Sequence, residues 1–314
     1  MPPVLSVPGR HVIRRQAASV ALRYTITTNH TPKASPDNVQ TKLPSASGSK
    51  NAQRFREFDL QDRVFAVTGG ARGLGLAMAE ALMEAGANVW CLDRLNVPNA
   101  ELEAAKECAQ GHYGGSIKYA HIDVRDEAHV SSLIAEIASK QQRLDGILCA
   151  AGINHIHSAI GYPQHALDEV MKINYNGVFN CATAAAQQMF RYKTKGSILL
   201  VASMSGLIAN KGMISPVYNS SKAAVIQLGR CLAMEWGRHG IRVNSLCPGH
   251  IMTPMVDQVF EKNPAARATW ESENMMGRLA RPEEFRGAAL FALSDASTFM
   301  TGSNLVIDGG HTAW

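Results

Sequence analysis

The sequence predicts an α/β fold: a single doubly wound Rossmann domain whose seven-stranded parallel sheet has helices on both faces. From Leu60 onward, short apolar runs of strand length alternate with longer stretches of helical spacing, which is the pattern of βαβ units. The 314-residue chain is 46% hydrophobic and 18% charged, as expected for a protein with a substantial core. A glycine cluster, TGGARGLG at 68–75, follows the first strand directly.

The predicted strands are rich in β-branched and aliphatic residues, as buried parallel strands are. They lie at 64–67, 87–92, 116–122, 145–150, 197–202, 242–247 and 304–309. Helical spacing fills the intervals near 74–86, 99–109, 126–140, 165–191, 217–238 and 282–293. Residues 58–314 are therefore predicted to form one domain, within the size range of such folds.

The first 57 residues differ in charge from the rest. They hold nine Lys or Arg against two Asp or Glu, whereas the remainder holds 22 against 24. An Arg-rich, Ser/Thr-rich and acid-poor start predicts a mitochondrial transit peptide, followed over 34–57 by a disordered linker. A disordered tail with no targeting role is the alternative, and it would leave the protein in the cytoplasm.

Composition also excludes several classes. The near-neutral body has no clustered basic face, so we expect no nucleic acid partner. No apolar run is long enough to span a bilayer, so we expect no membrane partner. The six cysteines form no Cys-x-x-Cys pair, which favours buried thiols in a reducing compartment.

The glycines at 68–75 have the spacing G-x-x-x-G-x-G, with Gly69, Gly73 and Gly75 between a strand and a helix. Free N–H groups and the positive end of the dipole at a helix N-terminus bind anions, and a dinucleotide pyrophosphate fits that role. The spacing differs from the G-x-G-x-x-G of many dehydrogenases. A tight turn without a ligand is the alternative.

Asp93 ends the second predicted strand. A carboxylate there accepts hydrogen bonds from the adenosine ribose hydroxyls and repels a 2′-phosphate, so NAD is favoured as the cofactor. Arg94 can pair with that phosphate, so NADP stays possible. A helix-capping Asp is the alternative role.

Tyr218 and Lys222 are spaced i, i+4, which places both on one face of a helix. An ammonium near a phenol lowers the phenol's pKa, and the tyrosine can then exchange a proton with a substrate oxygen. Ser203 follows a strand and can hold that oxygen, with Ser205 as its rival. A solvated helix face is the alternative explanation of the Tyr–Lys pair.

Five motifs occur in the order and spacing of one family: TG-x-x-x-G-x-G, A-x-S-x-S-G, Y-x-x-x-K, R-V-N-x-x-x-P-G and D-G-G. Over 58–314 the chain thereby resembles the short-chain dehydrogenase/reductase family. The resemblance implies one domain for cofactor and substrate, a homotetramer or homodimer, and the catalytic group Ser203, Tyr218, Lys222 and Asn174. Asn176, on the same segment as Asn174, is the less favoured fourth residue.

The resemblance also implies the cofactor contacts. It assigns the adenine to the stretch HIDV and the nicotinamide and phosphates to the stretch after the sixth strand. The implied contacts are Gly69, Arg72, Gly73, Leu74, Gly75, Asp93, Asp123, Val124, Ala151, Gly152, Tyr218, Lys222, Pro248, Gly249, Ile251 and Thr253. Two departures stand out: CAAG replaces the usual N-N-A-G at 149–152, and Ser203 precedes Tyr218 by more residues than in many members.

Local stretches narrow the resemblance. SMSGLIAN, YNSSKAAVIQL and VIDGGHTAW are similar to the fungal D-arabinitol 2-dehydrogenases, which interconvert D-arabinitol and D-ribulose with NAD. Three alternatives remain: an NADP-dependent sorbose or mannitol-type enzyme, a ketoreductase for 3-oxoacyl or secondary-metabolite ketones, and a non-catalytic cofactor-sensing protein. The expected partner is thus a small polyol or ketose.

Polar residues are expected to line the substrate pocket. With Ser203 and Tyr218, the candidates are Asn154, His155 and Asn210, and solvated loops are the alternative. No metal is predicted, because His155 and His157 lack a third ligand.

Residues 253–277 are expected to form a helical lid over the substrate. Within it, Met255, Val256, Val259 and Phe260 have the spacing of a pocket-facing side. Packing onto the body is the alternative for Val259 and Phe260.

Overall fold

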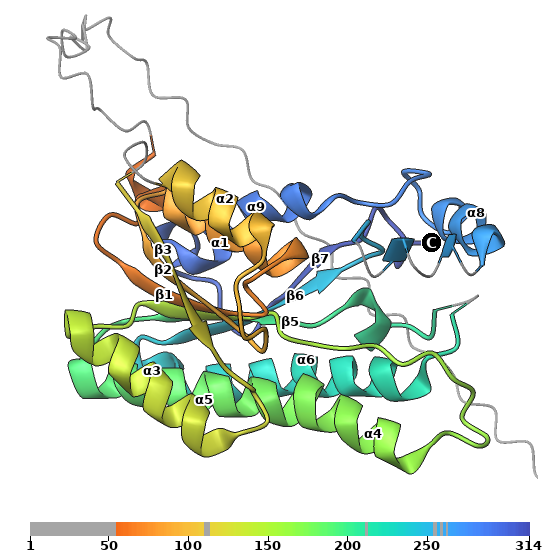
Figure 1. The fold of residues 1–314 in the computed structure, drawn as a ribbon, viewed down its shortest axis with the longest axis horizontal. Helices are drawn as coiled ribbons and strands as arrows, with labels where there is room; N and C mark the ends of the chain where they lie inside the picture. The colour runs from red at the N-terminus through yellow and green to blue at the C-terminus, as the bar shows by residue number, and fades with distance from the viewer. Residues whose placement is uncertain (1–54, 110–113, 211–212, 254–255, 258–259, 262) are drawn as a thin grey trace, which may run out of the picture. The chain divides into compact units, whose positions relative to one another are not determined.

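The computed structural model describes residues 55–109, 114–210, 213–253, 256–257, 260–261 and 263–314. Seven parallel strands form one sheet in the order β3-β2-β1-β4-β5-β6-β7, as Figure 1 shows. They are β1 (Val64–Thr68), β2 (Asn88–Asp93), β3 (Ser116–His121), β4 (Gly146–Cys149), β5 (Ser197–Val201), β6 (Arg242–Pro248) and β7 (Asn304–Ile307). The predicted fold class is confirmed, with strand bounds within two residues of those expected.

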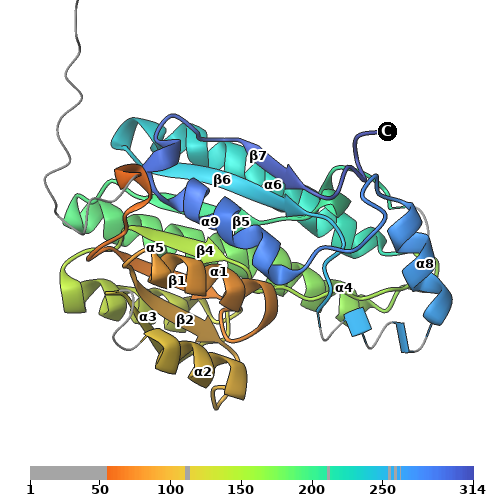
Figure 2. The same ribbon diagram turned by 90° about the horizontal axis from the view of Figure 1, so that it is seen from above.

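Helices cover both faces of this sheet (Figures 1 and 2). One face carries α1 (Gly73–Glu84), α2 (Ala100–Ala109) and α9 (Arg286–Leu293). The other carries α3 (Glu127–Gln141), α4 (Gln164–Met171), α5 (Val178–Tyr192) and α6 (Pro216–Trp236). The helix α8 (Pro264–Ser272) lies at the end of this domain where the C-terminus also lies. No helix within the described ranges is long and apolar enough to cross a membrane.

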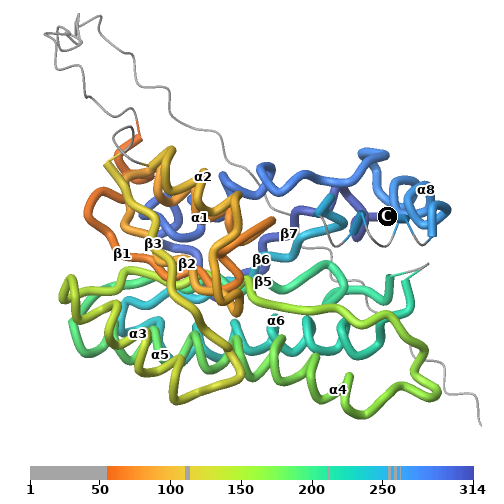
Figure 3. Tube along the Cα trace, viewed as in Figure 1, coloured from red at the N-terminus to blue at the C-terminus, as the bar shows by residue number. Residues whose placement is uncertain are grey.

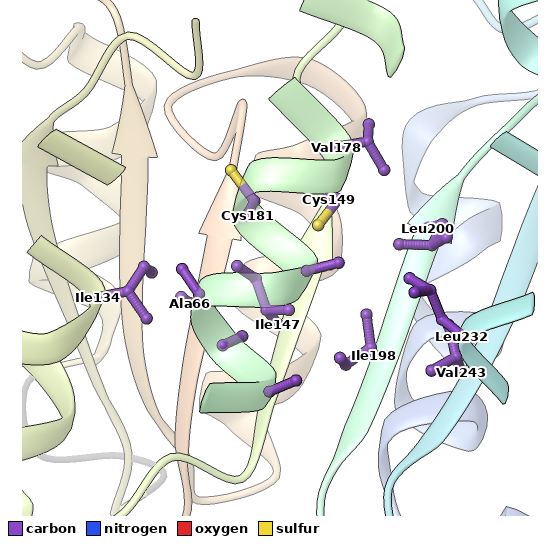
Figure 4. Packing of buried hydrophobic residues seen from close by; sticks show 14 of the residues in the cluster. Ala66, Ile134, Ile147, Cys149, Val178, Cys181, Ile198, Leu200, Leu232 and Val243 are labelled. Carbon is purple, nitrogen blue, oxygen red and sulfur yellow. The ribbon is translucent and has the colours of Figure 1, made fainter. Parts of the chain in front are cut away.

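Two apolar cores lie on opposite faces of the sheet, because alternate strand residues point to opposite sides. Val64 and Ala66 belong to the core under α3, α5 and α6, whereas Phe65 and Val67 belong to the core under α1 and α9. Figure 4 shows the first core, in which Ala66 lies among side chains from the neighbouring strands and helices. All six cysteines are free, and four of them are buried.

The predicted helix over 165–191 is not continuous. A π-helical segment, Lys172–Gly177, separates α4 from α5. Gly177 packs against Val124 so closely that a Cβ on Gly177 would lie 2.6 Å from Val124 Cγ2. The segment also buries Asn174 completely. Apolar spacing does not distinguish a π-helical turn from an α-helical one, so the sequence did not predict this interruption.

The strand order reverses between β1 and β4. From β1 the chain proceeds outward to β2 and β3, and it then returns to β4 on the other side of β1, as the tube in Figure 3 lets the reader follow. Thr68, at the end of β1, pairs with Leu92 of β2 and Cys149 of β4. The loops that leave β1 and β4 diverge there, and ligands of open α/β sheets bind in the crevice between such loops.

Candidate active site

A cleft of about 360 Å³ occupies this crevice. Its size lies in the range of small-molecule sites. The loops after β1, β2, β3 and β4 contribute to it, together with one residue after β6. Eleven of the predicted cofactor contacts line the cleft: Gly69, Arg72, Gly73, Leu74, Gly75, Asp93, Asp123, Val124, Ala151, Gly152 and Thr253.

The glycine loop has the geometry that an anion site needs. Gly75 passes so close to the loop that a Cβ would lie 2.1 Å from the Gly69 carbonyl oxygen. Gly73 has φ +55°, and the space beside it is open. Its helix α1 begins without a side-chain cap, so its first N–H groups face the cleft without a side-chain acceptor. The residues present therefore fit a dinucleotide pyrophosphate.

The β2 end of the cleft carries opposed charges. The Asp93 carboxylate accepts a hydrogen bond from the Ala71 N–H at 3.4 Å, which holds it toward the glycine loop. Arg94 also lines the cleft and is exposed. Asp93 is thus held toward the glycine loop, whereas Arg94 is exposed to solvent.

Asp123 is held by a residue that the sequence argument did not consider. Arg125 Nη2 lies 2.5 Å from Asp123 Oδ2, and the Arg125 N–H donates to Asp123 Oδ1 at 3.0 Å. The Arg125 hydrogen bond lowers the pKa of the Asp123 carboxyl. Arg125 also lines the cleft and lies only two residues beyond Asp123 in the sequence. This short separation was the signal from which Arg125 could have been predicted as a site residue.

The proposed catalytic lysine is buried beside the cleft floor. Lys222 is 4% exposed, and its Nζ donates to the Val201 carbonyl at 2.8 Å. A Cβ on Gly152, which lines the cleft, would lie 3.5 Å from that Nζ, so Lys222 lies directly behind Gly152. Burial lowers the pKa of Lys222 to about 8.

Tyr218 departs from the expected electrostatics. Lys222 Nζ lies 5.6 Å from the centre of the Tyr218 ring. Burial raises the pKa of the phenol above its usual value, and a hydrogen bond with Ser203 acts in the opposite direction. The pKa is therefore raised and not lowered as expected, because desolvation is the largest influence, and the Lys222 ammonium donates its hydrogen bond to the Val201 carbonyl.

The two candidate serines have different environments. Ser203 Oγ accepts a hydrogen bond from the Ser205 N–H at 3.1 Å and faces Tyr218. Ser205 is 3% exposed, and its Oγ accepts a hydrogen bond from Asn210 Nδ2 at 2.5 Å. The geometry favours Ser203 as the group that holds a substrate oxygen, with Ser205 as its support.

Asn174 connects the π-helical segment to the cleft. Its amide donates to the Ile153 carbonyl and accepts from the Ile153 N–H, both at 2.9 Å. It also donates to Ser221 Oγ at 3.1 Å, next to Lys222 in α6. Asn176 is exposed, so its side chain does not take part in this arrangement. Asn174 therefore fixes the backbone that lines the cleft.

Three of the predicted polar substrate contacts share a feature: each has a buried polar atom for which the part of the chain that the structure describes offers no hydrogen-bond partner. These atoms are Asn154 Oδ1, His155 Nδ1 and Asn210 Oδ1. The loop bearing the first two is joined to the start of α6, because the His157 N–H donates to the Ile214 carbonyl at 3.1 Å. Unpaired buried polar atoms are costly, so each of these atoms can accept a polar partner. None of the three residues lines the 360 Å³ cleft itself.

The stretch after β6 is only partly in the cleft. Thr253 lines it, whereas Pro248, Gly249 and Ile251 do not. Gly249 packs against Asp308, where a Cβ would lie 2.6 Å from the Asp308 Cα. Ile251 forms a parallel bridge with Ala280 and contacts the core under α1.

The expected lid is described in part. Helix α8 lies inside 253–277, whereas Met255 and Val259 fall outside the described residues. Val256 and Phe260 pack on a small cluster of Met213, Trp270 and Leu279. Phe260 contacts Trp270 edge-on at 5.2 Å between ring centres. For Phe260 the packing alternative therefore holds.

Comparison with known proteins gives consistent matches. A family profile described as Enoyl-(Acyl carrier protein) reductase matches residues 69–312. The short chain dehydrogenases/reductase notP' of Aspergillus versicolor is 38% identical, over 90% of this chain and 100% of its own. The ribulose-forming D-arabinitol 2-dehydrogenase of Scheffersomyces stipitis is 34% identical, over 82% of this chain and 96% of its own. A crystal structure of a short-chain type dehydrogenase/reductase from Mycobacterium marinum superposes with a TM-score of 0.76 and 35% identity, over 82% of this chain and 99% of that one.

Proposed function

Because the chain belongs to the short-chain dehydrogenase/reductase family and is an oxidoreductase of the alcohol dehydrogenase type, we propose that it interconverts D-arabinitol and D-ribulose with NAD. The observation that supports this most is the set of unpartnered polar atoms on Asn154, His155 and Asn210. A polyol supplies hydroxyl groups that pair with such atoms, whereas an apolar ketone does not. The similarity to D-arabinitol 2-dehydrogenases agrees with this choice.

The chain's own residues then have distinct tasks. Bound NAD would accept the hydride from the carbinol carbon. Tyr218 takes the hydroxyl proton, and Ser203 donates a hydrogen bond to the same oxygen as it becomes a carbonyl oxygen. Lys222 stabilises the phenolate by its positive charge, and Asn174 positions the Ile153 backbone. In the reverse direction, Tyr218 returns the proton to the ketose oxygen.

Asp93 supports NAD as the cofactor. Its carboxylate is anchored by the Ala71 N–H and would lie against a 2′-phosphate with an unfavourable charge. We expect Asp93→Asn to raise the KM for NAD and to lower the KM for NADP, each by about tenfold, since Arg94 stays available. Asp126→Asn, which alters an exposed helix cap, is the control. Unchanged KM values for both cofactors would contradict this assignment.

A substrate panel tests the polyol proposal. With one enzyme preparation, kcat/KM is measured for each member of the panel. The panel contains D-arabinitol, other pentitols and hexitols, cyclic alcohols and a 3-oxoacyl thioester. The proposal expects the highest value with D-arabinitol and a drop of at least about tenfold when one hydroxyl contact is lost. Preference for the thioester or for a cyclic alcohol would replace the polyol assignment and leave the catalytic group intact.

The cellular location is proposed from the sequence, and the oligomeric state is proposed from the family. We infer mitochondrial import from the basic, acid-poor composition of residues 1–57, of which 1–54 lie outside the described ranges. A fluorescent reporter fused behind residues 1–57 should enter mitochondria, and a diffuse cytoplasmic signal would contradict the proposal.

A homotetramer or homodimer is expected, and light scattering of the purified chain measures the molar mass that distinguishes them.

A further inference from the structure

Two histidines and a glutamate from three separate segments meet near the C-terminus. His250 follows β6, Glu273 caps the end of α8, and His311 lies in the turn after β7. One ligand atom of each side chain lies within 4.8 Å of the other two. Among the residues that the structure describes, no other group of His, Cys, Asp or Glu side chains comes together in this way.

Two of these side chains have a buried polar atom for which the described residues provide no hydrogen-bond partner. Glu273 Oε2 and His311 Nδ1 both lack a partner, and His311 is only 7% exposed. Leaving a buried polar atom unpaired costs about 1–3 kcal/mol, so such atoms need an explanation. A bound cation would satisfy both atoms at once.

His250 is held in a suitable position. Its ring stacks on Trp270 with 4.2 Å between ring centres and 6° between planes, which fixes the imidazole. The stacked ring keeps one ligand nitrogen within 4.8 Å of the ligand atoms of Glu273 and His311.

The backbone around each side chain is also fixed. The His250 carbonyl accepts from the Ala280 N–H at 2.9 Å. Next to Glu273, the Asn274 amide donates to the Trp270 and Arg278 carbonyls at 3.2 and 3.0 Å. On either side of His311, the Gly310 and Thr312 N–H groups donate to the Asp308 carboxylate at 2.9 and 2.8 Å. The three side chains thus project from an ordered frame.

We propose that His250, Glu273 and His311 bind a divalent transition metal ion, of which Zn²⁺ fits the ligand set best. Two imidazoles and one carboxylate are a common zinc set that leaves a fourth position for water. Tetrahedral zinc places its ligand atoms about 3.3 Å apart, and the three ligand atoms lie within 4.8 Å of one another, so they need to draw together by at most about 1.5 Å. The ion would join α8 to the ends of β6 and β7, outside the cofactor cleft.

This role is structural and separate from the proposed chemistry. In the sequence, only His155 and His157 are close enough together to suggest a metal site. His250, Glu273 and His311 are far apart along the chain. Their proximity became visible only when the segments after β6, α8 and β7 were placed together. The inference does not depend on the polyol assignment, and its test uses no substrate.

The test uses the full chain without a histidine tag, stripped with a chelator and titrated with Zn²⁺ or Co²⁺ alone. We expect one ion per chain, a Co²⁺ absorption spectrum of low coordination number, and a rise of at least about 3 °C in the thermal midpoint with saturating Zn²⁺. Glu273→Gln and His311→Gln should each weaken Zn²⁺ binding by at least about tenfold. His165→Gln, at an exposed histidine on α4, is the matched control and should bind as the wild type does.

Absence of Zn²⁺ binding to the wild type would overturn the proposal, as would equal binding by wild type and Glu273→Gln. Circular dichroism checks that each variant is folded. Should His311→Gln fail to fold, the nearly isosteric Glu273→Gln decides alone, because it keeps the side-chain volume and removes the carboxylate. A direct Glu273–His311 hydrogen bond without a metal would appear as a stability loss in Glu273→Gln with no Zn²⁺ response in the wild type.

Discussion

At the scale of single residues, the phenol of Tyr218 is subject to two opposed influences. Burial raises its pKa, and the hydrogen bond with Ser203 lowers it. The first effect is larger, so Tyr218 carries its proton at neutral pH. The residue is then ready to protonate a carbonyl oxygen, whereas oxidation of an alcohol requires the phenolate.

Replacement of this hydroxyl isolates its role. Tyr218→Phe removes the proton-transfer group but keeps the ring, so we expect kcat to fall by at least about 10³-fold while NADH binding is unchanged. Turnover is followed by NADH absorbance, and binding by NADH fluorescence. Tyr192→Phe, at the end of α5, serves as the control. A Tyr218→Phe enzyme with normal kcat would disprove the assigned role.

The pH profile follows from the same charges. The phenolate is the active form for oxidation and Tyr218 has a raised pKa, so kcat/KM for alcohol oxidation should rise with pH between about 6 and 9. The ketone-reduction rate should stay level over the same range, because Tyr218 keeps its proton below its raised pKa. Lys222 is charged below its pKa of about 8, so Lys222→Met should shift the rise to higher pH. A rate of oxidation that does not change with pH would contradict this account.

The two serines provide a comparison within one loop. Ser203→Ala removes the hydrogen-bond donor to the reacting oxygen, and we expect kcat to fall by about 10²–10³-fold. Ser205→Ala removes only the acceptor for Asn210, so its effect should stay within about tenfold. Steady-state measurement of kcat for both variants shows which serine holds the reacting oxygen. The reverse order of effects would assign the catalytic role to Ser205.

At the scale of elements, the sequence predicted the strands well because their Val, Ile and Leu runs are bounded by Gly, Asn and Asp. It placed Gly69, Gly73 and Gly75 correctly because a strand and a helix flank them. It missed the π-helical segment at Lys172–Gly177, since an extra residue in one turn leaves the apolar spacing almost unchanged. It also did not foresee that Ile153 is held by Asn174, which depends on contacts across the sheet.

The π-helical segment can be tested by its stability. Asn174→Ala leaves the Ile153 N–H and carbonyl without these partners, at about 1–3 kcal/mol for each buried group left unpaired. Urea unfolding measures the loss. Asn180→Ala, which removes a single 3.2 Å bond to the Val124 carbonyl, is the matched control. If Asn174→Ala were no less stable than Asn180→Ala, the role of Asn174 in holding the cleft would be wrong.

At the scale of the whole domain, function arises where the carboxyl ends of parallel strands meet. The loops after β1 to β4 form the cleft, and α6 places Lys222 behind Gly152, one of its lining residues. Motif order predicted the cleft because the glycine motif follows a strand, whereas the Tyr218–Lys222 motif lies within the helix α6. Nothing in the local sequence connects His250, Glu273 and His311, whose proximity depends on the packing of three segments. Such distant contacts are what sequence reasoning could not supply.

The polyol assignment itself is tested most directly by one measurement. NADH absorbance is recorded for the purified enzyme with D-arabinitol and NAD, with NADP in a parallel cuvette, and the product is identified. The account predicts reduction of NAD, little reduction of NADP, and D-ribulose as the product. Turnover with NADP alone would show that Arg94 outweighs Asp93. No turnover with any pentitol or hexitol would contradict the polyol assignment.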